Sequence, residues 1–145
     1  YLDPALCVIA HDPSRGVAIW LADEKPNDNV HVSELRVLWW SAGSGTLRLE
    51  RVDWPDAWPP ELIDEEDVIL PPGTDFFAAM EAQRAAGLTV FETILEEVDA
   101  FSVDYEPASV QDARLLRMTV TLTAGETQRD LLMTFGLSNY DKPYE

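Results

Sequence analysis

The stretch ELRVLWWSAGSGTLRLERVDW, from Glu34 to Trp54, contains two runs of alternating residues joined by a segment of small ones. The first run alternates between two faces, one formed by Leu35, Val37 and Trp39 and the other by Arg36, Leu38 and Trp40. After the SAGSG segment, Leu47 and Leu49 alternate with Arg48 and Glu50. A period of two on either side of glycines is typical of a β-hairpin.

The remaining segments predict further strands and one helix. RGVAIWLAD (15–23) has the length and apolar content of a strand. In 101–106 and 115–135 the apolar residues again alternate, and AGET forms the turn into a last strand. DFFAAMEAQRAAG (75–87) predicts a short helix that Thr74 or Asp75 caps and Gly87 ends.

Prolines limit regular structure in two places. Residues 54–74 contain five prolines, which predicts an ordered surface loop with one helical turn. YLDPALCVIAHDP (1–13) predicts the end of a helix followed by a loop. We therefore expect a single domain over residues 1–145 of the α+β class, an antiparallel meander sheet packed with a short helix.

The charge and cysteine content exclude several classes of protein. The net charge is −17, from 27 acidic and 10 basic residues. Such a field repels nucleic-acid phosphates and anionic lipids, so we expect no nucleic-acid partner. Cys7 is the only cysteine, which excludes an internal disulfide. No apolar run reaches the roughly 18 residues of a membrane-spanning helix.

No residue pattern predicts catalysis. The sequence lacks a G-x-S-x-G nucleophile motif, and Cys7 and His11 form the only Cys–His pair at helical spacing. Two histidines cannot supply a three-histidine zinc site. The acidic groups at 65–67 and 96–99 are expected to be solvated, because pairs arise by chance in so acidic a chain. We therefore expect no enzyme activity.

One loop has oxygen ligands at calcium-binding spacing. In DEKPNDNVHVSE (23–34), the ligand positions of a twelve-residue calcium loop are matched by Asp23, Asn27, Asn29 and Glu34. Lys25 occupies the third position, however, and Asp28 replaces the glycine of the sharp turn. A polar turn without an ion is the favoured interpretation, and a calcium site is the alternative.

Tryptophans gather in the hairpin and the proline-rich loop. Trp54 and Trp58 are candidate interface residues, because tryptophan is enriched where proteins bind one another. Packing of the loop and the hairpin against the core is the other interpretation, and it is the favoured one.

Four segments resemble a known family. SELRVLWWSAGSGTLRLERVDWP (33–55) resembles the hairpin of prepilin-like proteins, which carry an N-terminal cleavage and methylation signal. ILEEVDAFSVDYEP (94–107) and LLRMTVTLTAGETQRDLLMTF (115–135) are similar to later strands of that family. VAIWLADEKPNDNVHVSEL (17–35) resembles the segment before the hairpin in some bacterial members. The closest type is the minor pseudopilin of type II secretion systems or a related type IV pilin-like protein.

The resemblance implies a structural role. The chain would be the soluble head of a longer pilin-like protein, and residues 1–10 would include the end of its stalk helix or the first connection after it. It would contact other pilin subunits in a filament, and it would meet the membrane only through an N-terminal helix outside this chain. That places it at the bacterial inner membrane and periplasm or in an extracellular filament. An acidic inhibitor or immunity-type protein that binds a basic partner is the alternative, motivated by the net charge.

Overall fold

The computed structural model describes residues 7–21, 29–106 and 113–137. Of these residues 55% lie in strands and 17% in helices, so the chain is mostly β. The strands form three antiparallel sheets. The predicted α+β class, a pilin-like head with one meander sheet and a helical layer, is therefore wrong.

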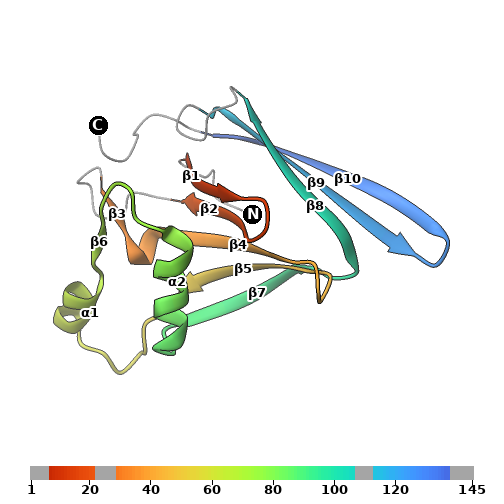
Figure 1. Cartoon of the computed structure of the whole chain (residues 1–145). Helices are drawn as coiled ribbons and strands as arrows, with labels where there is room; N and C mark the ends of the chain where they lie inside the picture. The colour runs from red at the N-terminus through yellow and green to blue at the C-terminus, as the bar shows by residue number, and fades with distance from the viewer. Residues whose placement is uncertain (1–6, 22–28, 107–112, 138–145) are drawn as a thin grey trace.

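The central sheet has five strands in the order β1-β2-β4-β5-β7 (Figure 1). Their bounds are β1 (Cys7–Asp12), β2 (Gly16–Trp20), β4 (Leu35–Ser41), β5 (Thr46–Val52) and β7 (Thr89–Leu95). The predicted hairpin is confirmed as β4 and β5, which pair antiparallel from Arg36 and Arg51 to Ser41 and Thr46.

A second sheet, here called the cover sheet, lies over one face of the central sheet (Figure 1). It has three strands in the order β10-β9-β8, with bounds β8 (Val98–Glu106), β9 (Leu115–Ala124) and β10 (Thr127–Gly136). The third sheet pairs the short strands β3 (Val30–His31) and β6 (Ile69–Leu70). A 3-10 turn, η1 (Val32–Glu34), connects β3 to β4.

The opposite face of the central sheet packs against helix α2 (Phe76–Ala85). Asp75 caps this helix by accepting a hydrogen bond from the backbone N–H of Ala78, as the sequence predicts. A second short helix, α1 (Pro60–Glu66), lies within the proline-rich segment, where Pro60 takes the first helical position.

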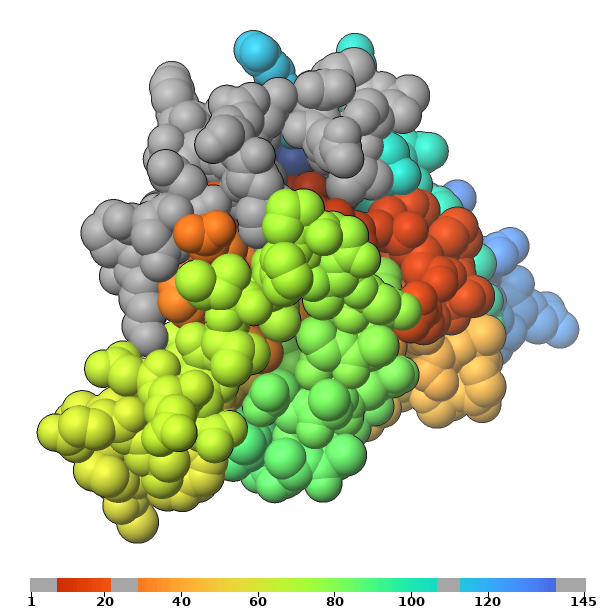
Figure 2. Space-filling view, turned by 60° about the vertical axis from the view of Figure 1, so that its left-hand side comes forward, coloured from red at the N-terminus to blue at the C-terminus, as the bar shows by residue number. Residues whose placement is uncertain are grey.

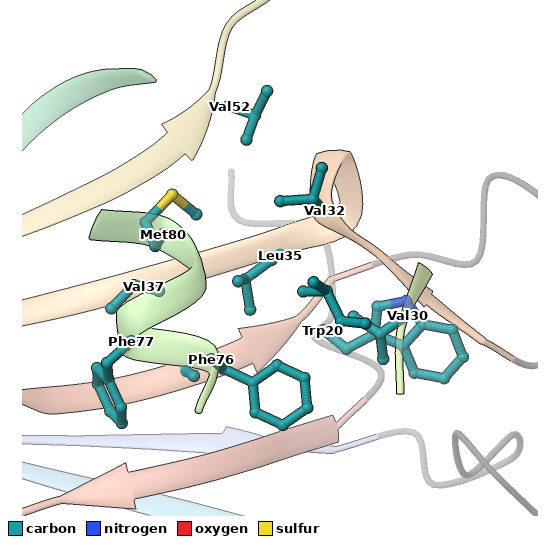
Figure 3. Packing of buried hydrophobic residues seen from close by; sticks show 11 residues of the cluster. Trp20, Val30, Val32, Leu35, Val37, Val52, Phe76, Phe77 and Met80 are labelled. Carbon is teal, nitrogen blue, oxygen red and sulfur yellow. The ribbon is translucent and has the colours of Figure 1, made fainter. Parts of the chain in front are cut away.

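Each face of the central sheet has its own hydrophobic core. The helix-face core contains, among others, Trp20, Leu35, Val37, Phe76, Phe77 and Met80 (Figure 3). The inter-sheet core contains, among others, Val17, Leu38, Leu47, Val103, Leu116, Met118 and Val120. Trp39 packs against the first core and Trp40 against the second, because adjacent residues of a strand point to opposite faces.

The chain leaves the central sheet for the cover sheet at a sharp corner after β7. Glu97 adopts a left-handed backbone conformation there, with φ 57°. The backbone N–H of Val98 then donates to the carbonyl of Gly45 in the β4–β5 turn, at 2.9 Å. This corner starts a new sheet where the alternation of the sequence suggested one continuous meander.

The N-terminal expectation is also corrected. Residues 7–10 belong to strand β1 and not to the end of a helix, while residues 1–6 lie outside the described part. Pro13 follows the strand, in the turn that joins β1 to β2. Within the described ranges, neither helix has the length and apolar character needed to span a bilayer.

Candidate ligand cavity between the sheets

A cavity of about 450 Å³ lies between the central sheet and the cover sheet. The central sheet lines it with apolar side chains that include Leu38, Leu47 and Leu49, and the cover sheet with Leu116, Met118 and Met133. These residues share one face in each sheet because side chains alternate along a strand. Small-molecule sites have this size, roughly 300–1,000 Å³, and this apolar character.

The cavity opens towards solvent at the β7 edge of the central sheet. Ile94 lines the cavity and is 38% exposed, so it stands at the rim. On the cover sheet, Met133 and Phe135 of the edge strand β10 line the same space and are half-buried. The two sheets are tied on the other side, where His11 of β1 bonds to Tyr105 of β8. The exposed and half-buried lining residues named here therefore lie at the β7–β10 side, while a hydrogen bond joins the sheets at the β1–β8 side.

Arg36 is the one charged side chain among the described residues that line the cavity. Its Nη1 donates to the carbonyl oxygens of Ser33 at 2.7 Å and Leu35 at 2.9 Å. The backbone therefore holds one side of the guanidinium, and the rest of the lining is almost wholly apolar. Such a surface suits the hydrocarbon part of a ligand better than a polar substrate.

Glu50, on the helix face of β5, has a buried carboxylate with several partners. It is fully buried and accepts hydrogen bonds from Trp39 Nε1 at 2.6 Å and Thr89 Oγ1 at 2.7 Å. Arg84 of α2 binds both of its oxygens, at 2.9 and 2.7 Å, and this contact raises the pKa of Arg84. The guanidinium also lies over the rings of Trp39 and Phe91. The network holds the helix on the sheet. Both carboxylate oxygens of Glu50 already accept hydrogen bonds from protein groups.

A second buried polar cluster contains a serine, a histidine and an aspartate without forming a catalytic triad. Ser33 donates its hydroxyl to Asp67 Oδ2 at 2.8 Å, and its backbone N–H to Oδ1 at 2.9 Å. His31 Nδ1 lies 2.9 Å from the backbone carbonyl of Asp67 and therefore donates its proton to it. A nucleophilic serine needs its hydroxyl bonded to the base, and here the hydroxyl points to the carboxylate instead. The cluster braces β3 and η1 against the end of α1.

The predicted calcium ligands are only partly within the described residues. Asp23 and Asn27 lie outside them. Glu34 is buried, and its Oε2 accepts from Trp20 Nε1 and from the backbone N–H of His31, both at 3.0 Å. No group of three metal-binding side chains occurs in the described ranges. The calcium site, with Asn29 as its remaining ligand, stays a prediction.

The two candidate interface tryptophans contact each other. Trp54 and Trp58 are stacked, with ring centroids 5.8 Å apart and planes 23° apart. Both are half-buried, and Trp54 packs against the helix-face core. This is the loop packing that the sequence favours, and their use in an interface stays a prediction.

Cys7 and His11 do not form an i, i+4 helical pair, because both residues lie in strand β1. His11 Nδ1 lies 3.1 Å from the hydroxyl of Tyr105, and the rings meet edge to face. Burial lowers the pKa of His11, although Asp12 and Asp104 act in the opposite direction. His11 therefore joins the two sheets. Glu96, Glu97 and Asp99 are exposed, as expected of a solvated group of acids. In the other acidic group the expectation is wrong for Asp67, which is buried because its carboxylate accepts hydrogen bonds from Ser33.

Sequence reasoning missed the cavity, but a signal for it was present. Strand β4 is apolar on both faces, with Leu35 and Val37 on one and Leu38 and Trp40 on the other. A strand that is apolar on both faces is covered on both faces. That pattern indicates that a second layer covers the central sheet, but it does not indicate a cavity between the two layers.

No protein-family model matches this chain, and no curated protein or solved structure is similar enough to count as a match. The cavity is therefore interpreted from its own geometry and chemistry.

Proposed function

We propose that this protein is a binding module that holds an elongated apolar molecule, or the hydrocarbon part of a larger one, between its two sheets. The observation that carries the proposal is the cavity of about 450 Å³, lined from both sheets by aliphatic and methionine side chains. Burying a ligand there removes apolar surface from water at roughly 25 cal/mol per Å².

The charge of the chain favours an uncharged ligand. The net charge of −17 opposes the approach of an anion. Arg36, the cation at the cavity, already donates to two backbone carbonyls. A neutral hydrophobic molecule meets neither obstacle, so it is the class that the site accepts best.

The proposal is tested with the neutral fluorescent probe N-phenyl-1-naphthylamine. We expect saturable binding near one probe per chain, with the blue shift of an apolar environment. Leu49→Trp and Ile94→Trp place a larger side chain at the floor and the rim of the cavity, so each should weaken probe binding by about tenfold or more.

Thr119→Trp is the matched control, since Thr119 lies on the outer face of the cover sheet, away from the cavity. It should leave the affinity unchanged. Circular dichroism melts establish that each variant is folded. Absence of saturable binding, or equal binding by folded Leu49→Trp and Ile94→Trp variants, refutes the proposal.

The two functions expected from the sequence stay predictions. The filament role presupposes a pilin-like α+β head, and the observed three-sheet fold differs from it. Its test is the coding sequence upstream of Tyr1, where a basic leader and about 20 apolar residues are required. The inhibitor role rests on the charge of −17, and its test is capture of one basic protein in a salt-sensitive complex.

A further inference from the structure

Strand β10 forms a long edge of the cover sheet. It pairs with β9 over ten residues in unbroken register, from Thr127 opposite Ala124 to Gly136 opposite Leu115. On its other side no strand of the described chain is hydrogen-bonded to it. Leu131 is 43% exposed and Leu132 is 63% exposed, and the β9–β10 hairpin projects from the molecule (Figure 2).

The other edge strands of the two larger sheets, β1, β7 and β8, carry features that discourage pairing with a further strand. The pairing of β1 shifts register between Val8 and Ala10, and that of β8 between Val98 and Ala100. The β5–β7 pairing shifts between Leu47 and Arg48. Strand β8 also carries exposed acidic side chains. Bulges and charges of this kind protect edges. Strand β10 has exposed charges only at Arg129 and Asp130, near the hairpin turn, and it has neither a bulge nor a proline.

The turn of the hairpin determines which backbone groups of β10 face outwards. Gly125 and Glu126 form a two-residue turn, with Gly125 at φ 63° and Glu126 outside the left-handed region. This fits a type II′ turn, whose flanking pair, Ala124 and Thr127, exchanges hydrogen bonds. Because such pairs alternate along an antiparallel ladder, the even-numbered residues of β10 direct their N–H and C=O groups away from β9.

We propose that β10 is a dimerisation edge and that its partner is β10 of a second copy of this chain. The two strands run antiparallel about a two-fold axis at Leu132, so that Leu132 of each copy faces Leu132 of the other. In this register the remaining opposed residues are Leu131 with Met133, Asp130 with Thr134, Arg129 with Phe135 and Gln128 with Gly136.

In this register the outward backbone groups of the two strands can form hydrogen bonds, and their side chains can pack against one another. Even-numbered residues oppose one another, so the outward backbone groups pair. Leu131 meets Met133 on the inner, apolar face, and Arg129 meets the ring of Phe135 on that face. Leu132 meets its own copy on the outer face. A strand that complements itself this way makes an isologous interface, which is why a second copy fits better than an unrelated chain.

The net charge sets the expected salt dependence. Two chains of −17 each repel one another, and added salt screens that repulsion. Dimerisation through β10 should therefore strengthen as sodium chloride rises. A complex with a basic protein would weaken under the same change, so the sign of the salt effect distinguishes the two kinds of partner.

The first test is the mass of the 145-residue chain by analytical ultracentrifugation over a wide range of concentration, at low and high sodium chloride. We expect twice the 16.3 kDa monomer mass at high salt. Leu132→Asp places two carboxylates opposite each other at the axis and should weaken association by about tenfold or more. Thr123→Asp adds the same charge to the outer face of β9 and should weaken it far less.

The second test fixes the register by oxidative cross-linking. Leu132→Cys places two thiols across the axis at roughly 5.5 Å between Cα atoms, within disulfide reach. This variant should therefore form a disulfide-linked dimer through position 132 when an oxidant is added. Leu131→Cys, on the other face and opposite Met133, should not cross-link. Peptide mapping separates these products from any that contain Cys7.

Each outcome decides the proposal. A monomer at all concentrations and salts overturns it, as does a dimer that Leu132→Asp leaves intact. Cross-linking through residue 131 in place of residue 132 overturns the register. These measurements do not involve probe binding in the cavity, so they test the dimer independently of the proposed function.

Discussion

The two faces of the central sheet are covered in different ways. On the helix face, Glu50 lies beneath α2 and binds Arg84, Trp39 and Thr89, so directional bonds fix the helix from within the interface. On the other face, hydrogen bonds tie the cover sheet near its margins, at His11–Tyr105 and Val98–Gly45. Apolar contacts and the cavity lie between those ties. Hydrogen bonds and ion pairs fix one position of the helix on the sheet, whereas apolar side chains between the sheets can repack around a bound ligand.

The largest expected effect concerns the sheet that both faces share. A Cβ at Gly16 would lie 1.9 Å from the backbone oxygen of Leu38, and φ is +136° there. Gly16→Ala should therefore cost about 4 kcal/mol, from backbone strain and from the shift that the clash forces between β2 and β4. Urea unfolding measures this cost. Gly43→Ala, which meets no atom within 4 Å, should change stability by less than about 0.5 kcal/mol.

Removal of the buried carboxylate tests whether the helix face depends on directional bonds. Glu50→Leu leaves Arg84, Trp39 Nε1 and Thr89 without their acceptor, and it should cost about 3 kcal/mol. This cost lies at the low end of the range for breaking a buried ion pair, because the Arg84 side chain is 39% exposed and its guanidinium can be solvated instead.

The matched control is Glu92→Gln, an exposed carboxylate on the neighbouring strand β7. Its cost should stay below about 0.5 kcal/mol. Urea unfolding compares the two variants, and similar costs would show that the network adds nothing beyond surface electrostatics.

The same truncation on the two faces measures how tightly each is packed. Met80 is fully buried in the helix-face core, whereas Met118 is buried beside the cavity. Met80→Ala should cost about 3 kcal/mol and Met118→Ala about 2, because a side chain at a void loses fewer contacts on truncation. Urea unfolding of both variants gives the difference. A larger cost for Met118→Ala would mean that the inter-sheet face is the more tightly packed.

Local patterns predicted several of the individual elements, but they missed strand β1 and did not predict how the elements assemble. The β4–β5 hairpin and α2 with its Asp75 cap follow from periodicity and from turn and capping residues. The division into two sheets depends on Glu97, whose left-handed backbone turns the chain out of the central sheet. A glutamate carries no sequence signal for that conformation, because L-residues other than glycine rarely adopt it.

The candidate site was hidden for a similar reason. Its lining residues are ordinary apolar positions of the strands, and sequence does not distinguish a filled core from one with a gap. The buried network of Glu50 was equally invisible, since Glu50 occupies a regular position in the alternating run of β5. Such a carboxylate is recognised only when Arg84, 34 residues later, comes to lie beside it.

The smallest expected effect is the pH dependence of the tie between the sheets. Burial lowers the pKa of His11 from 6.5, so the folded state binds a proton there less readily than the unfolded state. The neutral ring therefore contributes stability above pH 6.5, and this contribution is lost as the pH falls below that value. His11→Gln keeps a hydrogen-bonding group beside Tyr105 but does not titrate. On acidification from above to below pH 6.5, the urea midpoint of the unmodified chain should fall further than that of His11→Gln. Equal shifts would show that the carboxylates alone cause the acid sensitivity, and that the β1–β8 tie does not depend on the charge of His11.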